Sequence, residues 1–318
     1  MKYVGRKLVR LIVVVLAVTM LTFLLMSFLP GDKAIAIGGP GRSEEEYDQI
    51  RKDWGLNKPL PIRYVTWLGN TVRGDMGVSS AFNVPVSQLI KDRLPVSLYL
   101  MLYGLSLGLL ISIPLGILAA YQANRPVDRL LNTGAFGLLS VPNFVMAVLL
   151  VFLFALRLQW FPAISEYIAP WDDPIAHIRN FFLPVLAIAI GEIAVFMRLL
   201  RSDMVGTLQN DFITLARSKG MTSSHILMRH AFRPSTFSLI TAAAVNVGAL
   251  IGGTIVVEQT FALPGMGNLI VEAIARRDFL VVQMCVVVFS IIFVVANFTV
   301  DLLYAAIDPR IRHARALG

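Results

Sequence analysis

Charged residues are scarce in this sequence: they make up 15% of its 318 residues, whereas an ordinary soluble domain carries about 25%. Cysteine is almost absent, and a single one, Cys285, excludes an internal disulfide framework. Hydrophobic residues account for 56% of the chain. Low charge combined with this much apolar sequence is typical of a protein embedded in a membrane, and it excludes the disordered and fibrous classes.

Several motifs that carry chemistry are absent as well. No G-x-x-x-x-G-K-[ST] loop occurs, and neither does an H-E-x-x-H or paired-cysteine metal pattern. His225 and His230 lie five residues apart, which would place them about 140° apart around an α-helix. The G-x-S-x-G match at residues 104–108 falls inside an apolar run, not at a strand-to-helix turn. The sequence therefore predicts no enzyme, no metal site and no cofactor bound by this chain.

Six apolar runs are long enough to cross a bilayer, for which about 20 residues are needed. They cover residues 11–29, 94–124, 130–156, 181–197, 234–257 and 279–300. The first run is longer than a signal-peptide core and lacks a small-residue cleavage site, so a retained span is favoured over a cleaved signal. Pro142 predicts a kink in the third span. The predicted fold class is all-α, a polytopic membrane protein with six transmembrane helices.

Loop charge gives the orientation of these spans. Six spans place both termini on one side, together with residues 123–130 and 198–234. The loops of that side carry 15 Lys or Arg and four acidic residues. The opposite loops carry 13 Lys or Arg and 14 acidic residues. The positive-inside rule makes the first side cytosolic, with both termini there. The net charge of +8 therefore reflects topology, and nucleic acid is not an expected partner.

Four regions follow along the chain. They are a first transmembrane helix with a cytosolic N-terminus (1–30), an extracytoplasmic helical insertion (31–93), a five-helix transmembrane core (94–304) and a cytosolic tail (305–318). The core contains the cytosolic loop 198–234. In the insertion, Ser43 and Glu46 have the spacing of a capping box, which predicts a helix to about Trp54. A second helix is expected over residues 61–72.

A few residues stand out within the spans. Glu192 is acidic and lies inside the fourth span, where an ionisable side chain is a candidate for function. It could pair with a polar group of the bundle or line a water-filled path. Gly104 with Gly108, and Gly248 with Gly252, have a spacing that lets helices approach closely, either within the chain or in a dimer.

The loop 198–234 has the most informative local pattern. A short helix is expected from Asp211, with Gly220 ending it. Three apolar residues are expected on one face of this helix: Phe212, Leu215 and Ala216. Lipid, the protein's own bundle or a groove on a soluble partner could bury that face. Ser223 or Ser224 would cap a second helix that ends before Pro234.

This order of helix, glycine and second helix resembles the coupling loop of ABC importer membrane subunits. The general Glu-Ala-Ala pattern of that loop is matched only at Ala216, and His230 takes the position of a hydrophobic residue. The run Ala216-Arg217-Ser218-Lys219-Gly220, followed by Arg229-His230-Ala231, is similar to the variant in the dipeptide/oligopeptide permease family, A-R-A-K-G followed by R-H-A.

Further pieces of the chain resemble the same family in the same order. They are Pro30-Gly31-Asp32, Gly74-Asp75-Met76-Gly77 with Ser79, Arg93-Leu94-Pro95, Phe261 with Pro264-Gly265-Met266-Gly267, Arg277-Asp278, Asp301-Leu302-Leu303-Tyr304 and Asp308-Pro309-Arg310. The large segment between the first two spans resembles the first of the two permease subunits in such systems.

The resemblance implies an importer in a bacterial cytoplasmic membrane, with this chain forming half of the translocation path for peptides. The implied partners are a second homologous permease, two ATP-binding cassette ATPase subunits that bind the ATP, an extracytoplasmic substrate-binding protein and the lipid bilayer. The implied ATPase-coupling residues are Asp211, Phe212, Leu215, Ala216, Arg217, Lys219, Gly220 and His230. The candidate gate or pathway residues are Glu192, Phe261, Pro264 and Gly265.

Two other functions remain open from the residues alone. An ion-coupled secondary transporter would use Glu192 as its relay, although the two halves of the chain show no matched pair of interrupted spans. A non-transport scaffold or sensor would need neither a relay nor an ATPase. Substrates other than peptides, such as glutathione or nickel chelates, occur in the family that the chain resembles.

Overall fold

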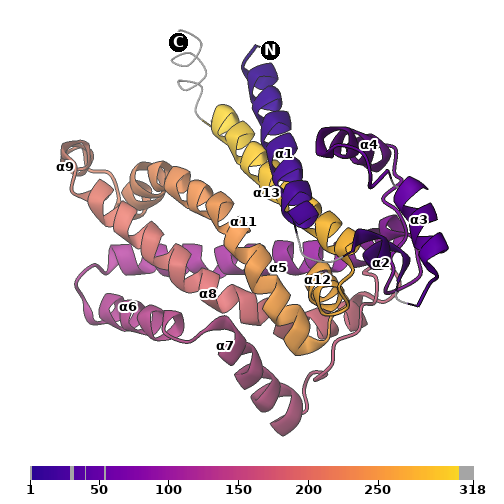
Figure 1. The fold of residues 1–318 in the computed structure, drawn as a ribbon. Helices are drawn as coiled ribbons and strands as arrows, with labels where there is room; N and C mark the ends of the chain where they lie inside the picture. The colour runs from indigo at the N-terminus through magenta and orange to yellow at the C-terminus, as the bar shows by residue number, and fades with distance from the viewer. Residues whose placement is uncertain (1, 29–31, 40, 54, 308–318) are drawn as a thin grey trace. The chain divides into compact units, whose positions relative to one another are not determined.

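The computed structural model in Figure 1 describes residues 2–28, 32–39, 41–53 and 55–307. Its helices, with η marking π-helices, are α1 (Lys2–Phe28), α2 (Lys33–Gly38), α3 (Glu44–Asp53), α4 (Leu60–Val72), α5 (Val86–Tyr121), α6 (Pro126–Leu139), α7 (Asn143–Leu150), η1 (Val151–Arg157), α8 (Pro174–Leu208), α9 (Asp211–Ser218), α10 (Ser223–His225), η2 (Ile226–Phe232), α11 (Arg233–Phe261), α12 (Met266–Ala275) and α13 (Phe279–Ile307). No strand occurs in the described ranges, where Val78 and Pro85 form an isolated β-bridge. The all-α class is confirmed.

Five helical segments of the described chain are long and apolar enough to cross a membrane, and a sixth is counted if a bent pair forms one span. The five are Val9–Phe28, Val86–Tyr121, Pro174–Leu208, Ser223–Phe261 and Phe279–Thr299. Most extend several residues beyond the apolar runs, because helices continue through the polar residues at the ends of such runs. The prediction of a polytopic membrane protein is confirmed.

The third predicted span, over residues 130–156, is not one straight helix. It is divided into α6 and the α7–η1 segment, which meet at an angle of 96° (Figure 1). Pro142 occupies the N-cap position of α7 with extended backbone angles. Proline lacks the N–H that would continue the helix and restricts the residue before it, so a break replaces the expected kink.

The helix predicted to end before Pro234 instead continues through it. A single helical segment, Ser223–Phe261, passes from α10 through η2 into α11. Its N-cap is Thr222 and not Ser223 or Ser224, since the Thr222 hydroxyl accepts from the backbone N–H of His225 (3.4 Å). A π-helical stretch directly before a proline is one way for a helix to pass that residue without ending.

Two compact units make up the chain, and the first comprises Met1–Ser97 and Pro264–Thr299. The predicted capping box of α3 is confirmed, because Glu46 N–H donates to the Ser43 hydroxyl (3.3 Å) and Ser43 N–H donates to the Glu46 carboxylate (2.8 Å). The second predicted helix is α4. Trp54, Pro30, Gly31 and residues 308–318, including Asp308-Pro309-Arg310, lie outside the described residues.

Asp278 joins two parts of the first unit that are distant in the sequence. Its buried carboxylate accepts hydrogen bonds from the Ser79 hydroxyl (2.5 Å) and the Ala81 N–H (3.1 Å), and also from the Val281 N–H at the start of α13 (3.2 Å). An apolar core surrounds the start of α5, α12 and α13. The loop before α5 is therefore fastened to the turn between α12 and α13.

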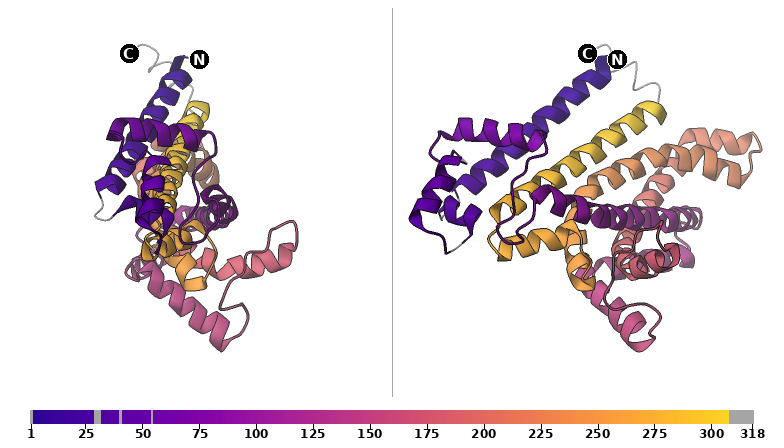
Figure 2. Two further views of the ribbon diagram at one scale, coloured as in Figure 1. Left: turned by 45° about the vertical axis from the view of Figure 1, so that its right-hand side comes forward. Right: turned by 90° about the vertical axis from the view of Figure 1, so that its right-hand side faces the viewer.

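The second unit contains Leu98–Leu263 and is built on α5, α8 and α11. Helices α8 and α11 pack against each other (Figures 1 and 2). A Cβ on Gly104 would stand 2.7 Å from Ile188 of α8, and one on Gly108 would stand 2.7 Å from the Glu192 Cβ. This glycine pair therefore serves close packing within the chain. Gly252, by contrast, has no atom within 4 Å of such a position.

Candidate functional site

The short helix α9 lies where α8 ends and α10 begins (Figures 1 and 2). The sequence had predicted it from Asp211, and it runs from Asp211 to Ser218. The backbone of Gly220 then takes the left-handed conformation, with φ +77°. No atom lies within 4 Å of where its Cβ would be, so the glycine is needed for its conformation and not for space.

The two faces of α9 have different surroundings. Ile213 and Ala216 are buried and pack with Ile226 of η2, so α9 is anchored to the long helical segment that follows it. Phe212 and Leu215 are 48% and 57% exposed. The prediction that Ala216 shares their face was wrong, because Ala216 points toward the anchoring side with Ile213. The spacing of Ile213 and Ala216, three residues apart, is a helical signal that could have revealed this second face.

His230 lies on η2, the element that α9 packs against. Its ring is 5.7 Å from that of His225, measured between centroids, although an α-helix would hold them about 140° apart. A π-helix bonds residues five apart, so it brings the two rings onto one face. The His230 Nε2 atom is buried without a hydrogen-bond partner. The described residues contain no group of three metal-ligating side chains.

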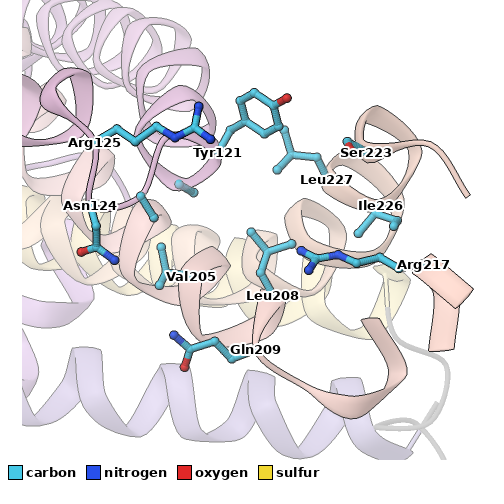
Figure 3. A pocket seen from close by; sticks show the side chains of 12 residues that line it. Tyr121, Asn124, Arg125, Val205, Leu208, Gln209, Arg217, Ser223, Ile226 and Leu227 are labelled. Carbon is cyan, nitrogen blue, oxygen red and sulfur yellow. The ribbon is translucent and has the colours of Figure 1, made fainter. Parts of the chain in front are cut away.

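A pocket opens between α9 and the helices beside it (Figure 3). It has a volume of about 410 Å³ and is lined by twelve residues: Ala120, Tyr121, Ala123, Asn124, Arg125, Val205, Leu208, Gln209, Arg217, Ser223, Ile226 and Leu227. One predicted coupling residue, Arg217, is among them. Asp211, Lys219 and Gly220 are exposed and line no part of it.

An ion pair fastens α6 to α8 inside the same unit. The Arg201 guanidinium donates to both carboxylate oxygens of Asp128, with 2.6 Å between Nη2 and Oδ2. Asn124 N–H (2.8 Å) and the Asn132 amide (2.6 Å) also donate to this carboxylate, which is buried. The sequence analysis missed this pair. Its two charges lie 73 residues apart, and neither carries a local signal.

Glu192 is buried within the second unit. The Asn246 amide of α11 donates to its carboxylate, and Gly108 of α5 packs against its Cβ. Glu192 thus connects three spans. Asn246 was missed, although a polar residue inside an apolar run is itself a signal for an intramembrane partner. Asn143, at the start of α7, approaches Gly191 beside Glu192, with 3.2 Å between its Oδ1 and a Cβ built there.

The remaining gate candidates are the last residue of α11 and two residues just before α12. Phe261 is fully buried at the end of α11, and its carbonyl accepts from the Ser165 N–H (2.9 Å). Pro264 and Gly265 belong to the first unit, where Gly265 is the N-cap of α12. The Met266 N–H donates to the Ser97 hydroxyl (2.8 Å). Helix α12 therefore starts at Met266, directly after the extended Gly265.

Comparison with protein families gives two matches that together cover most of the chain. Residues 112–313 match the family described as binding-protein-dependent transport system inner membrane component. Residues 1–101 match the family of the N-terminal part of such membrane components.

Individual relatives are similar over nearly the full length. A putative peptide transport system permease protein of Brucella abortus (strain 2308) is 40% identical over 312 residues, which cover 97% of this chain and 98% of the relative. The oligopeptide transport system permease protein AppB of Bacillus subtilis is 35% identical over 313 residues, which cover 98% of this chain and 99% of the relative.

One solved structure has a similar fold. A chain of the MetNI methionine ABC transporter in an inward-facing conformation superimposes with a TM-score of 0.56 at 14% identity. The match covers 70% of this chain and 97% of that chain. At this identity, the comparison bears on the fold alone.

Proposed function

Because the chain belongs to the family of binding-protein-dependent transport system inner membrane components, and is thus a permease subunit of an ABC importer, we propose that it forms half of a translocation path for peptides and is driven through α9. The family is a transport permease and not an enzyme. We assign ATP binding and hydrolysis to separate partner subunits.

The observation that carries this proposal is the division of α9 into two apolar faces. Ile213 and Ala216 anchor the helix to η2, while Phe212 and Leu215 remain exposed beside it. Exposed aromatic and aliphatic side chains on a short helix suit insertion into a groove of a soluble partner. A displacement of α9 would be transmitted through η2 to α11, because η2 and α11 belong to one continuous helical segment.

The partners follow from the same proposal. An ABC importer requires ATPase subunits and a membrane, and we propose two ATPases, a second homologous permease and an extracytoplasmic binding protein. Gly252 of α11 leaves open space where another helix could approach closely, which suits a permease pair. The cytosolic position of α9 and of both termini, in a bacterial inner membrane, is proposed from the excess of Lys and Arg in the loops on that side.

Peptides are proposed as the substrate because the relatives that are 40% and 35% identical are named as peptide and oligopeptide permeases. Uptake of labelled di- and oligopeptides should be lost in a strain lacking the chain and be restored by the gene. Uptake of the peptides at the same rate in the deletion strain would contradict the substrate assignment, and loss of glutathione uptake alone would replace it.

The two exposed residues of α9 give the direct test of the coupling role. Changing both Phe212 and Leu215 to serine should abolish co-purification of the ATPase subunits and ATP-driven uptake. Thr214→Ala is the matched control, because Thr214 is exposed on the same helix without being apolar. Retention of the ATPases by the double variant would contradict docking through α9.

We propose that the gate candidates have structural roles near the translocation path and take part in no chemical step. Glu192 holds α8, α11 and α5 together, so we propose that it sets how these spans move as a group. For Phe261 at the end of α11, and for Pro264 and Gly265 before α12, we propose positions near the external end of the path.

A further inference from the structure

The pocket beside α9 contains two positive charges and no acidic residue. Arg125 and Arg217 belong to its lining, and no Asp or Glu does. In the described part of the chain, neither guanidinium lies within 4 Å of a carboxylate, and the Arg125 guanidinium donates to the Gln122 side-chain oxygen (3.2 Å). The nearby Asp128 is already paired with Arg201. Within the described residues, neither positive charge of the lining is therefore neutralised by an ion pair.

The two arginines come from different elements and extend toward the same hollow (Figure 3). Arg125 lies in the turn before α6, whereas Arg217 lies on α9. Around them are polar side chains that can donate hydrogen bonds: Tyr121, Asn124, Gln209 and Ser223. Guanidinium groups match phosphate oxygens in geometry and charge, so the polar part of the pocket fits a phosphate group.

The rest of the lining is aliphatic. It consists of Ala120, Ala123, Val205, Leu208, Ile226 and Leu227, from α5 and the turn after it, α8 and η2. A volume of about 410 Å³ is in the range of small-molecule sites. An apolar wall next to paired arginines suits a phosphate ester that carries an apolar group. A transported peptide fits poorly, because the lining offers no carboxylate for its amino group.

We propose that this pocket binds a phosphate ester and that the bound ligand fixes the position of α9. The ligand would bridge Arg125 and Arg217, and so join α9 to the start of α6. Either the headgroup of an anionic phospholipid or a soluble phosphate ester could supply the phosphate. The position of the pocket at the cytosolic surface rests on the proposed function, whereas the binding itself does not.

Native mass spectrometry of the full-length chain, purified with its accompanying subunits, tests the binding. Phosphatidylglycerol should be retained about tenfold more strongly than phosphatidylcholine, and Arg125→Gln should remove most of this preference, as expected for the loss of one charge-assisted pair. Arg129→Gln is the matched control, since Arg129 is exposed on α6 and does not line the pocket. Competition by glycerol phosphate would identify the soluble source.

Hydrogen exchange gives a second readout that does not depend on transport. Residues 211–218 should exchange more slowly with phosphatidylglycerol than with phosphatidylcholine, and Arg217→Gln should remove the difference. Equal retention of both lipids by the wild-type complex, with no binding of glycerol phosphate, would overturn the proposal without any variant. Loss of the preference in Arg129→Gln as well would do the same. ATP-driven uptake that persists in that case would leave the proposed function intact.

Discussion

Replacing Gly220, the residue that ends α9, tests the coupling loop without removing any contact. The glycine has φ +77°, and no atom lies within 4 Å of a Cβ built on it. A larger side chain therefore meets open space, and the effect of a substitution comes from the backbone alone. Left-handed backbone costs an ordinary residue about 1–2 kcal/mol, more for a β-branched one, and least for asparagine.

Among substitutions of Gly220, valine should therefore displace α9 most, alanine less and asparagine least. A cost of about 2 kcal/mol for valine would lower the ratio of correctly placed to displaced α9 about 30-fold, whereas about 1 kcal/mol for alanine lowers it about fivefold. Gly220→Asn should remain close to the wild type, because asparagine adopts this conformation most readily after glycine.

Uptake and ATP hydrolysis should be measured together, in membranes that contain the complete transporter. Gly220→Val should hydrolyse ATP with little uptake per ATP, since the ATPases would still turn over while α9 fails to transmit their closure. If Gly220→Asn were as damaging as Gly220→Val, side-chain size and not backbone conformation would be the cause. Normal uptake by the valine variant would refute the coupling role of this turn.

Three further predictions concern other parts of the chain. Glu192→Gln should keep ATP-driven uptake within about twofold, because an amide can still accept the hydrogen bond that the carboxylate accepts; complete loss would instead favour an ion-coupled mechanism. Asp128→Ala should destabilise the protein by about 2–3 kcal/mol in thermal unfolding, since it leaves Arg201 without its partner, and adding Arg201→Gln should recover part of that loss. The Arg51 guanidinium holds the pKa of Asp32 below its usual value, so this pair contributes stability above about pH 4 that is lost as the pH falls; limited proteolysis between α2 and α3 should increase there, and Asp32→Asn should remove the pH dependence.

The features that sequence predicted well are those fixed by neighbouring residues. The capping box at Ser43 and the left-handed turn at Gly220 depend on a few atoms of the local backbone, so their residue types are sufficient signals. The apolar runs located the spans for the same reason, because each run must satisfy its own backbone in lipid.

What the sequence could not predict depends on packing between distant segments. Pro142 predicted only a kink, whereas the structure shows a 96° bend, with α6 packed on α8 and α7 packed on α8 and α11. The π-helix that brings His225 beside His230 has no residue pattern of its own. Ala216 was placed on the wrong face because Ile226, which covers it, comes from another element.

The candidate site divides in the same way. The residues of α9 were predicted from a local motif, whereas the distant residues that surround the candidate site residues were not. Asn246 binds Glu192 across 54 residues of sequence, and Arg125 lines the pocket with Arg217 although 92 positions separate them. A polar residue inside an apolar run, such as Glu192 or Asn246, signals that it has a partner, but a single sequence does not identify that partner. Arg125 has no local signal that would connect it to Arg217.

Reconstitution of the chain with its ATPase and permease partners in proteoliposomes tests the central claim most directly. Labelled oligopeptide, delivered with the binding protein, should accumulate only when ATP is present on the side of the ATPases, and the Phe212 and Leu215 double serine variant should abolish this uptake. Accumulation driven by an ion gradient without ATP, and unaffected by that variant, would contradict the account.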